Sequence, residues 1–349
     1  MSTQTALLVT EVGKPVTSTN TWPIPQPGPK QIQLRVTVAG LNPHDHKSRD
    51  GGLFIQDSLP AVLGNDVAGV VTALGPNSSR FKVGDRVFAQ SNLSPKSEQK
   101  GLQQQVVVDE DYAALVPEGF TEGDGVSLPT NIIAGLVGLF DESALGIPAP
   151  WTDAAKTFDY PNTTLLIIGG GSNCGKYAVQ LAKMVGIGKI VTVGGDEHQL
   201  KGYGATHVLG RHGGHDIVLQ RIRAVVGDDL IYAYDAINPP EDQILGVNAL
   251  SNTKKGKLAR LVPSGDIDES NMLPKQAGYE LKNVFGISHI RPEVSKPFWE
   301  RLGEYLMQGK IEPLPYVTVK GLDAAKVNEV LDGYRDGKPT TKTHFQISE

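Results

Sequence analysis

The chain has 349 residues, of which 39% are hydrophobic and 20% are charged, as is usual for a globular protein with room for two cores. A net charge of −5 without a basic run excludes broad electrostatic binding to nucleic acid, and no apolar run approaches the roughly 20 residues of a membrane-spanning helix. The single cysteine, Cys174, excludes an internal disulfide and a four-cysteine zinc site; since residues 1–14 have no secretory signal pattern, we expect a cytoplasmic protein.

Residues 1–125 have the pattern of a β-rich unit. Residues 32–39 (IQLRVTVA) alternate apolar and polar side chains, which predicts a strand with one buried face. Further short strands are predicted at 67–74 and 85–89, each bounded by residues that favour turns.

The pattern changes after Ser127. Strands are predicted at 165–168, 189–193, 207–209, 230–234 and 257–262. Helical patterns lie between them, including one that ends near Gly204 and one over 217–226. This alternation predicts an α/β fold with a doubly wound parallel sheet and helices on both faces. The tail, 316–349, reads as strand, helix (322–334) and strand, and is able to extend either unit.

A glycine-rich turn joins the strand 165–168 to the following helix. In GGSNCG, Gly170 and Gly175 keep the first and last glycines of the pattern G-x-G-x-x-G, while Ser172 replaces the middle one. A strand that opens through glycines into a helix N-terminus is an arrangement that holds phosphate, because the helix dipole and free N–H groups attract an anion. We therefore expect a dinucleotide here, with the Ser172 hydroxyl as a further donor; the alternative is a glycine-rich loop that binds nothing.

The residue that follows the strand 189–193 distinguishes NADH from NADPH in folds of this kind. An acidic residue there would bind the ribose of NADH and repel the 2′-phosphate of NADPH, but this chain has Gly194 and Gly195. Asp196 follows and reads as a helix N-cap, although it is also able to reach the ribose. Positive charge is available from His198, Lys201 or Arg211. We expect NADPH, with NADH possible.

Several segments together resemble the medium-chain dehydrogenase/reductase superfamily, in its zinc-free branch of quinone and enoyl reductases. The likeness is greatest to the fungal ToxD-like and trans-acting enoyl reductases of secondary metabolism. It is carried, over nearly the whole chain, by AGLNPHDHK (39–47), LGNDVAGVVTALG (63–75), FKVGDRVFA (81–89), SLPTNIIAG (127–135), the glycine turn, GATHV (204–208) and YDAI (234–237). The resemblance implies a GroES-like domain (1–128 and 313–349), a Rossmann cofactor-binding domain (129–312), and an active cleft where they meet.

The resemblance also bears on zinc. Zinc-dependent relatives have a cysteine in the segment that matches 41–47 and a His-Glu pair after the glycine that matches Gly64, whereas this chain has Asn65 and Asp66 there. His44 and His46 would face the same side if their segment were a strand. The family pattern N-P-x-D-x-K, which this segment follows, binds no metal, so we expect none.

Two catalytic candidates come from that pattern. Lys47 is suited to stabilise the enolate that forms after hydride transfer to an enone; the alternatives are a solvent-facing lysine or an ion pair with Asp45. Asp45 is the other candidate, although a role in fixing the loop is the simpler interpretation. Many relatives have a threonine near the nicotinamide where this chain has Ala134.

The remaining candidates are expected to contact the cofactor, mostly from the carboxyl ends of strands. They are Pro43, His44, Asn131, Gly170, Gly171, Ser172, Asn173, Cys174, Gly175, Gly194, Gly195, His198, Lys201, Asp235, Ala236, Ile237, Ser264 and Phe285. Ordinary turn or strand positions are the alternative for 235–237, 264 and 285. Cys174 is expected to pack against the cofactor rather than to act as a nucleophile, because no base adjoins it.

The sequence thus predicts an NADPH-dependent, zinc-independent oxidoreductase that reduces an activated C=C bond or a quinone. Its substrate would be a small molecule, hydrophobic or carrier-bound, and the protein a monomer or homodimer. Two alternatives stay open. One is a carbonyl reductase. The other is a cofactor-binding protein without hydride transfer (a sensor, scaffold or cyclase), which Ser172, Ala134 and the short, glycine-containing helix after Gly195 motivate. Residues 141–163 either border the substrate or form a packed surface loop.

Overall fold

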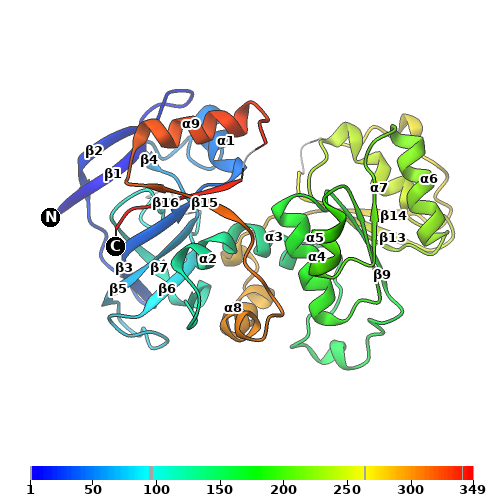
Figure 1. Ribbon diagram of the computed structural model, residues 1–349, viewed down its shortest axis with the longest axis horizontal. Coiled ribbons are helices and arrows are strands. Elements are labelled where there is room, and N and C mark those ends of the chain that lie inside the picture. The colour runs from blue at the N-terminus through cyan, green and yellow to red at the C-terminus, as the bar shows by residue number, and fades with distance from the viewer. Residues whose placement is uncertain (1, 94–96, 263–264, 340, 349) are drawn as a thin grey trace. The chain divides into compact units, whose positions relative to one another are not determined.

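Two compact units divide the chain in the computed structural model, which describes residues 2–93, 97–262, 265–339 and 341–348 (Figure 1). The first unit comprises Met1–Thr130, Phe298–Met307 and Pro313–Glu349. The second comprises Asn131–Pro297 and Gln308–Glu312. Each unit has its own hydrophobic core, of which Val36 and Phe345 are members in the first and Leu166 and Ile222 in the second.

The first unit is built on antiparallel sheets. A three-stranded sheet has the order β2-β1-β4, and a seven-stranded sheet has the order β15-β16-β3-β5-β6-β8, with β7 also paired to β3. The strands up to Thr130 are β1 (Thr3–Val9), β2 (Thr17–Pro23), β3 (Gln31–Gly40), β4 (Ala61–Val62), β5 (Asp66–Leu74), β6 (Arg86–Gln90), β7 (Gln105–Asp109) and β8 (Ala113–Leu115). The strands predicted at 32–39, 67–74 and 85–89 are therefore confirmed as β3, β5 and β6.

The helices that lie wholly within the described part of this unit are short. They are α1 (Pro43–Gly51), α2 (Glu122–Ser127) and α9 (Ala324–Arg335), with a 3-10 turn at Glu110–Tyr112. The predicted tail is confirmed as β15 (Tyr316–Lys320), α9 and β16 (Lys342–Gln346). It completes the first unit, because β16 pairs antiparallel with β3, His344 opposite Gly40.

The second unit is a Rossmann fold with six parallel strands. Their order, β11-β10-β9-β12-β13-β14, reverses direction next to β9, where doubly wound sheets bind ligands. The strands are β9 (Thr164–Ile168), β10 (Lys189–Val193), β11 (His207–Leu209), β12 (Tyr232–Asp235), β13 (Gly256–Arg260) and β14 (Tyr279–Asn283). All five predicted strands are present, within two residues at their ends.

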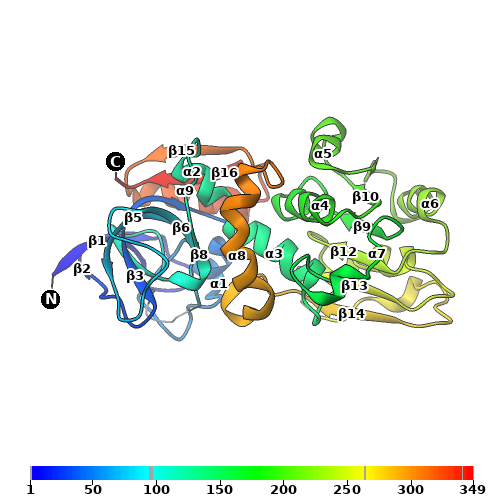
Figure 2. The same ribbon diagram turned by 90° about the horizontal axis from the view of Figure 1, so that it is seen from below.

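Helices cover both faces of this sheet, so the predicted α/β class is confirmed. Within the unit, α4 lies on one side of the strands and α6 and α7 on the other (Figures 1 and 2). The helices wholly within this unit are α4 (Asn173–Val185), α5 (Glu197–Tyr203), α6 (His215–Val226) and α7 (Ile244–Ala249), with 3-10 turns at Asp153–Lys156, Pro240–Asp242, Glu269–Asn271 and Ser288–Ile290. Two further helices, α3 (Pro129–Phe140) and α8 (Pro292–Met307), are divided between the units, α3 after Thr130 and α8 after Pro297.

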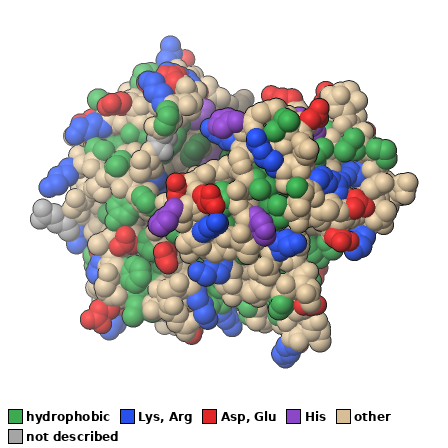
Figure 3. Space-filling view, turned by 45° about the vertical axis from the view of Figure 1, so that its right-hand side comes forward, with side chains coloured by type: hydrophobic (Ala, Val, Ile, Leu, Met, Phe, Trp, Pro, Cys, Tyr) green, Lys and Arg blue, Asp and Glu red, His purple; other side chains and the backbone are tan. Residues whose placement is uncertain are grey.

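Two properties of the described residues bear on partners. None of their helices combines the length and apolar character needed to cross a bilayer. Acidic and basic side chains are intermixed on the face drawn in Figure 3, without a broad field of one sign.

Candidate active site

The glycine turn after β9 packs so tightly that side chains are excluded. A Cβ on Gly170 would lie 2.8 Å from the carbonyl oxygen of Gly194, and one on Gly175 would lie 2.3 Å from that of Gly169. Gly169 itself has a φ of +84°, which favours glycine. The turn is thus held against the end of β10: the Gly169 and Gly170 N–H groups donate to the Val193 carbonyl, and Gly171 is the exposed glycine that a phosphate is able to approach.

Ser172 explains the departure from G-x-G-x-x-G. It is the N-cap of α4: its Oγ accepts a hydrogen bond from the Gly175 N–H at 3.0 Å and donates to the Gly169 carbonyl at 2.8 Å. Because a hydroxyl has one hydrogen, the predicted donation from Ser172 to a phosphate does not fit this arrangement. Its role here is to start the helix whose N-terminus, at Asn173 and Cys174, is suited to attract an anion.

The two residues that follow β10 have no side chains beside the glycine turn, which leaves room for the ribose end of a dinucleotide. Gly194 and Gly195 have φ angles of +77° and +105° and carry no side chain. Asp196 is confirmed as the N-cap of α5, because its carboxylate accepts from the Gln199 N–H at 2.7 Å. The Cδ of Arg211 would lie 3.4 Å from a Cβ on Gly194. The Arg211 side chain therefore passes next to Gly194, the position at which an acidic residue would favour NADH.

The other cations near this point differ in their surroundings. Lys201 is exposed and pairs with Glu197 on the same helix at 2.7 Å, and His198 is exposed. Lys176, which the sequence interpretation missed, is half-buried in the first turns of α4; burial lowers its pKa, while nearby Asp196 raises it. Arg211 thus contacts the end of β10 at Gly194, and Lys176 lies close enough to Asp196 for that carboxylate to act on its pKa.

Asp235 ends β12 and is buried. Its Oδ1 accepts from the N–H groups of Ile237 and Asn238, whereas its Oδ2 is buried without a hydrogen-bond partner among the described residues. Burial raises the pKa of Asp235 to about 6, against the lowering effect of those N–H donors. Ala236 follows in the turn, and the half-exposed Ile237 packs over Gly169. The turn 235–237 thus lies beside the glycine turn 169–175, and the Asp235 Oδ2 is left to accept a hydrogen bond from a ligand.

Asn131 and Cys174 lie together at the starts of α3 and α4. The Cys174 thiol is 3.6 Å from the Asn131 Oδ1 and is half-buried. Phe285 is half-exposed beyond β14, and the next residue, Gly286, packs on α3 so closely that its Cβ would lie 2.7 Å from the Cα of Ala134. Ser264 lies outside the described residues.

The candidates of the first unit lie on a helix. Pro43, His44, Asp45, His46 and Lys47 belong to α1, so the assumption of a strand was wrong, and two histidines two positions apart do not share a helix face. No group of three or more His, Cys, Asp or Glu side chains suited to a metal occurs among the residues that the structure describes.

Asp45 and Lys47 differ in their environments. Asp45 is buried; its carboxylate accepts from the N–H of Asn42 at 2.8 Å and from that of Gly64 at 3.1 Å. This is the loop-fixing arrangement that was the simpler interpretation. Lys47 is exposed, and no ion pair joins it to Asp45 among the described contacts.

Comparison with known proteins decides the family. A family model described as "Alcohol dehydrogenase GroES-like domain" matches residues 28–128. The dehydrogenase OrsE of Emericella nidulans is 30% identical over 363 residues, which cover 99% of this chain and 100% of that protein. The chain belongs to the medium-chain dehydrogenase/reductase family.

Further relatives indicate the branch of this oxidoreductase family. The trans-enoyl reductase HimH of Aspergillus japonicus is 28% identical, with 91% of this chain and 90% of that protein covered. The enoyl reductase component LovC of the lovastatin nonaketide synthase of Aspergillus terreus is 31% identical, with 68% and 64% covered. The chain is a member of the enoyl and quinone reductase branch.

Solved structures share the fold. An alcohol dehydrogenase superfamily protein from Novosphingobium aromaticivorans has a TM-score of 0.80 at 24% identity, with 99% of this chain and 100% of that chain covered. The CurK enoyl reductase has a TM-score of 0.79 at 17% identity, with 99% of both covered. A mycobacterial protein, Rv1454c, crystallised with NADPH, has a TM-score of 0.72 at 21% identity, with 98% and 99% covered.

In this medium-chain reductase the residues that match the zinc-binding His-Glu pair have other partners. Asp66 is fully buried, and its carboxylate pairs with the Lys342 ammonium and accepts from the Asn42 Nδ2 at 2.8 Å and the Thr130 hydroxyl at 2.6 Å. Although burial acts to raise the pKa of Asp66, Lys342 and the hydrogen bonds lower it overall. The sequence interpretation missed Lys342, because it comes from β16, far along the chain.

Proposed function

We propose that this chain is an NADPH-dependent, zinc-independent reductase of an activated C=C bond or a quinone. The observation that carries the proposal is the tightly packed glycine turn between β9 and α4, beside Gly194, where the Arg211 side chain passes. A reduced nicotinamide, when bound, would supply the hydride.

Each part of the second unit has a task in this proposal. The backbone of the glycine turn and the N-terminus of α4 would hold the diphosphate. Gly194 leaves space for a 2′-phosphate, and Arg211 and Lys176 would neutralise it. The turn 235–237 and Phe285 would border the nicotinamide end. Asn131 and Cys174 would line the same side.

The first unit supports zinc independence. An amide, Asn65, replaces an imidazole ligand, and Asp66 is engaged by Lys342, Asn42 and Thr130. Both changes weaken a zinc site, which needs several good ligands. Alkene and quinone reduction do not depend on a Lewis acid as alcohol oxidation does. Lys47, exposed on α1, stays the proposed enolate-stabilising group.

Two of the motives for a protein without hydride transfer have another explanation. Ser172 caps α4, so its presence needs no loss of cofactor binding to explain it. Ala134 lies under Gly286, where the backbone approaches α3 too closely for an added side chain on that glycine. As partners we propose a hydrophobic or carrier-bound enoyl substrate, in line with the names of the fungal relatives.

The test is a fluorescence titration with NADPH and NADH, followed by turnover with enones and quinones in the presence of a chelator. Wild-type protein should bind NADPH more tightly and oxidise it. Arg211→Ala should weaken NADPH binding about 10-fold or more and leave NADH binding nearly unchanged. Lys254→Ala is the matched control, because that exposed lysine pairs with Asp229 at 2.5 Å and is not a cofactor candidate. Equal weakening for both cofactors would contradict the phosphate assignment.

A further inference from the structure

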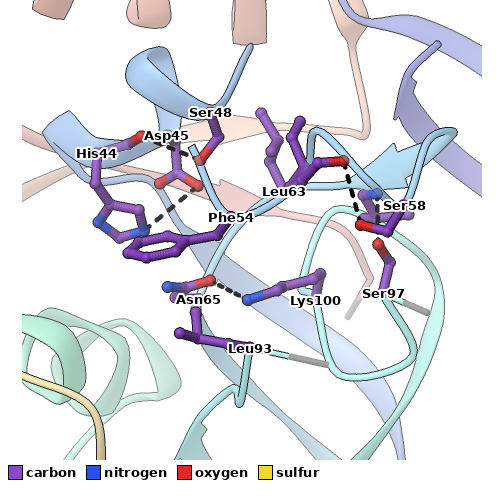
Figure 4. A pocket seen from close by; sticks show the side chains of 12 residues that line it. His44, Asp45, Ser48, Phe54, Ser58, Leu63, Asn65, Leu93, Ser97 and Lys100 are labelled. Atoms are coloured by element: carbon purple, nitrogen blue, oxygen red, sulfur yellow. Dashed lines mark hydrogen bonds and ion pairs between the residues drawn. The ribbon is translucent and has the colours of Figure 1, made fainter. Parts of the chain in front are cut away.

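A small cavity lies within the first unit, beside α1. Its volume is about 20 Å³, which is room for one water molecule. Polar and charged groups converge on it from three segments: His44 and Asp45 from α1, Asn65 before β5, and Ser97 and Lys100 from the loop before β7, with Phe54 as an aromatic wall (Figure 4).

Lys100 is unusual because lysine side chains are seldom buried. It is 7% exposed, and its ammonium donates to the Asn65 Oδ1 at 2.5 Å and to the Asn92 carbonyl at 2.7 Å. An ammonium has three hydrogens, so one remains beyond these two bonds. Burial lowers the pKa of Lys100 to about 8, while the charges of Asp45 and Asp66 raise it. No carboxylate of the described residues forms an ion pair with it.

His44 faces the same cavity with an unmatched atom. Its Nε2 is buried without a hydrogen-bond partner among the described residues, and it is 3.8 Å from the Asp45 Oδ1, too far for a hydrogen bond. The His44 side chain is also 22% exposed, so the ring connects the cavity to the surface of the unit. One water in the cavity would satisfy both the Nε2 and the remaining hydrogen of Lys100.

Two of the four described non-glycine residues with positive φ line this cavity. Phe54 and Ser97 both line it and have φ angles of +64° and +59°, which are uncommon for residues other than glycine. Ser97 is locked by a hydrogen bond from the Val62 N–H to its Oγ at 3.0 Å. Such conformations persist where the surrounding structure requires them, often at functional sites.

We propose that Lys100 and His44 form a proton relay through one water in this cavity, which supplies the proton that completes reduction. This inference rests on the proposed function. A bound reduced nicotinamide would supply hydride to the β-carbon of an enone, and the resulting enolate would need one proton at its α-carbon. A proton passes from the Lys100 Nζ to the water, the water gives one of its protons to the His44 Nε2, and the His44 Nδ1 gives its proton to the α-carbon. Lys100 is left as a neutral amine and His44 with its proton on Nε2. Lys100 recovers a proton from solvent, and the 22% exposed His44 ring returns to the Nδ1–H form by exchange with solvent.

The relay predicts a pH profile. The groups that face Lys100 are His44 and Asp45 on α1 and Asp66 on β5, so kcat with an enone should be level at neutral pH and fall above about pH 8, as Lys100 loses its proton. Lys100→Met should lower kcat about 100-fold and remove this alkaline fall, with little change in KM. Lys100→Arg, which keeps the charge but does not release a proton, should lower kcat similarly. Lys82→Met, at an exposed lysine of the same unit, is the control.

Two readouts separate the relay from a structural role. In Lys100→Ala, added primary amines should restore turnover in proportion to their basicity. In the cofactor-free wild type, two lysine Cε resonances should titrate near pH 8, because burial lowers the pKa of Lys275 to about 8 as well. The resonance of Lys100 should disappear in Lys100→Arg and shift in His44→Gln, whereas that of Lys275 should do neither. An unchanged alkaline fall in Lys100→Met, or a Lys100 resonance that titrates above pH 10, would overturn the relay. Failure of the wild type to oxidise NADPH with any acceptor would instead count against the proposed function. The resonance titration would still test whether Lys100 interacts with His44.

Discussion

Gly175 lies where the first turn of α4 passes the end of β9, and a Cβ there would meet the Gly169 carbonyl oxygen at 2.3 Å. The constraint comes from the protein's own backbone, so a substitution distorts the turn before any ligand is considered. Gly175→Ala should therefore both lower the stability of the second unit, by about 2 kcal/mol, and abolish dinucleotide binding.

A matched control for this change lies on α5. Gly202 has open space around its Cβ position, and Gly202→Ala should leave NADPH binding unchanged and slightly raise stability, because alanine favours a helix. Fluorescence titration and urea unfolding measure both effects. Wild-type affinity in Gly175→Ala would refute dinucleotide binding at this turn.

Asp235 gives a pH prediction at the same scale. Its pKa is raised to about 6 by burial, so the folded protein holds a proton that the unfolded chain releases near pH 4. Stability is therefore greatest below pH 4 as far as this group is concerned, and falls as the pH rises to about 6. Asp235→Asn keeps an acceptor for the Ile237 and Asn238 N–H groups and should flatten this part of the curve. Unfolding followed by urea at pH 4 to 7 tests it; an unchanged slope would contradict the assignment.

At the scale of elements, substitutions can distinguish the helix-capping role of Ser172 from a role as a phosphate ligand. Ser172→Ala removes the acceptor of the Gly175 N–H and should cost about 1 kcal/mol of stability, with a weakening of NADPH binding of less than about 10-fold. Ser172→Thr, which keeps a capping hydroxyl, is the control. If binding fell by several orders of magnitude while stability was unchanged, the hydroxyl would be a phosphate ligand after all.

The elements of the second unit were predictable because apolar periodicity marks them, as in the run 165–168 before the glycines. The helix α1 was not, since its buried residues are Asp45, Ser48 and Arg49. These polar side chains are held by partners distant in sequence: Gly64 donates to Asp45, and Arg49 pairs with Asp332 of α9 at 2.7 Å. No local pattern reports such contacts.

The same reason explains what was predictable in the candidate site. The turn 170–175 and the capping role of Asp196 are local and could be read from the sequence. Lys176, Lys100 and Lys342 acquire their positions only when separate segments pack, so their residue types alone gave no signal. The sequence showed that Ser172 departs from the pattern G-x-G-x-x-G, but its hydrogen-bond partners could be identified only in the folded structure.

At the scale of the whole molecule, a buried ion pair joins the chain's distant parts within the first unit. Asp66 on β5 and Lys342 on β16 pair with each other, and Thr130 donates to the same carboxylate. Asp66→Asn leaves the buried ammonium without a counter-charge and should lower stability by about 3 kcal/mol. Because the pKa of Asp66 is lowered, its contribution is present above about pH 4 and is lost on acidification.

Denaturant unfolding at pH 7 and pH 3 measures this contribution. The double variant Asp66→Asn with Lys342→Met should recover part of the loss, since it removes the unpaired cation as well. A single variant as stable as wild type at pH 7 would show that the pair does not hold these strands together.

The account as a whole depends on hydride transfer from NADPH without zinc. The most direct measurement follows the nicotinamide absorbance of NADPH mixed with chelator-treated protein and a panel of α,β-unsaturated carbonyls and quinones. We predict that the absorbance falls with at least one acceptor, at a rate that added zinc does not raise. A protein that binds NADPH yet leaves its absorbance unchanged with every acceptor, or that turns over only after zinc is added, would contradict the account.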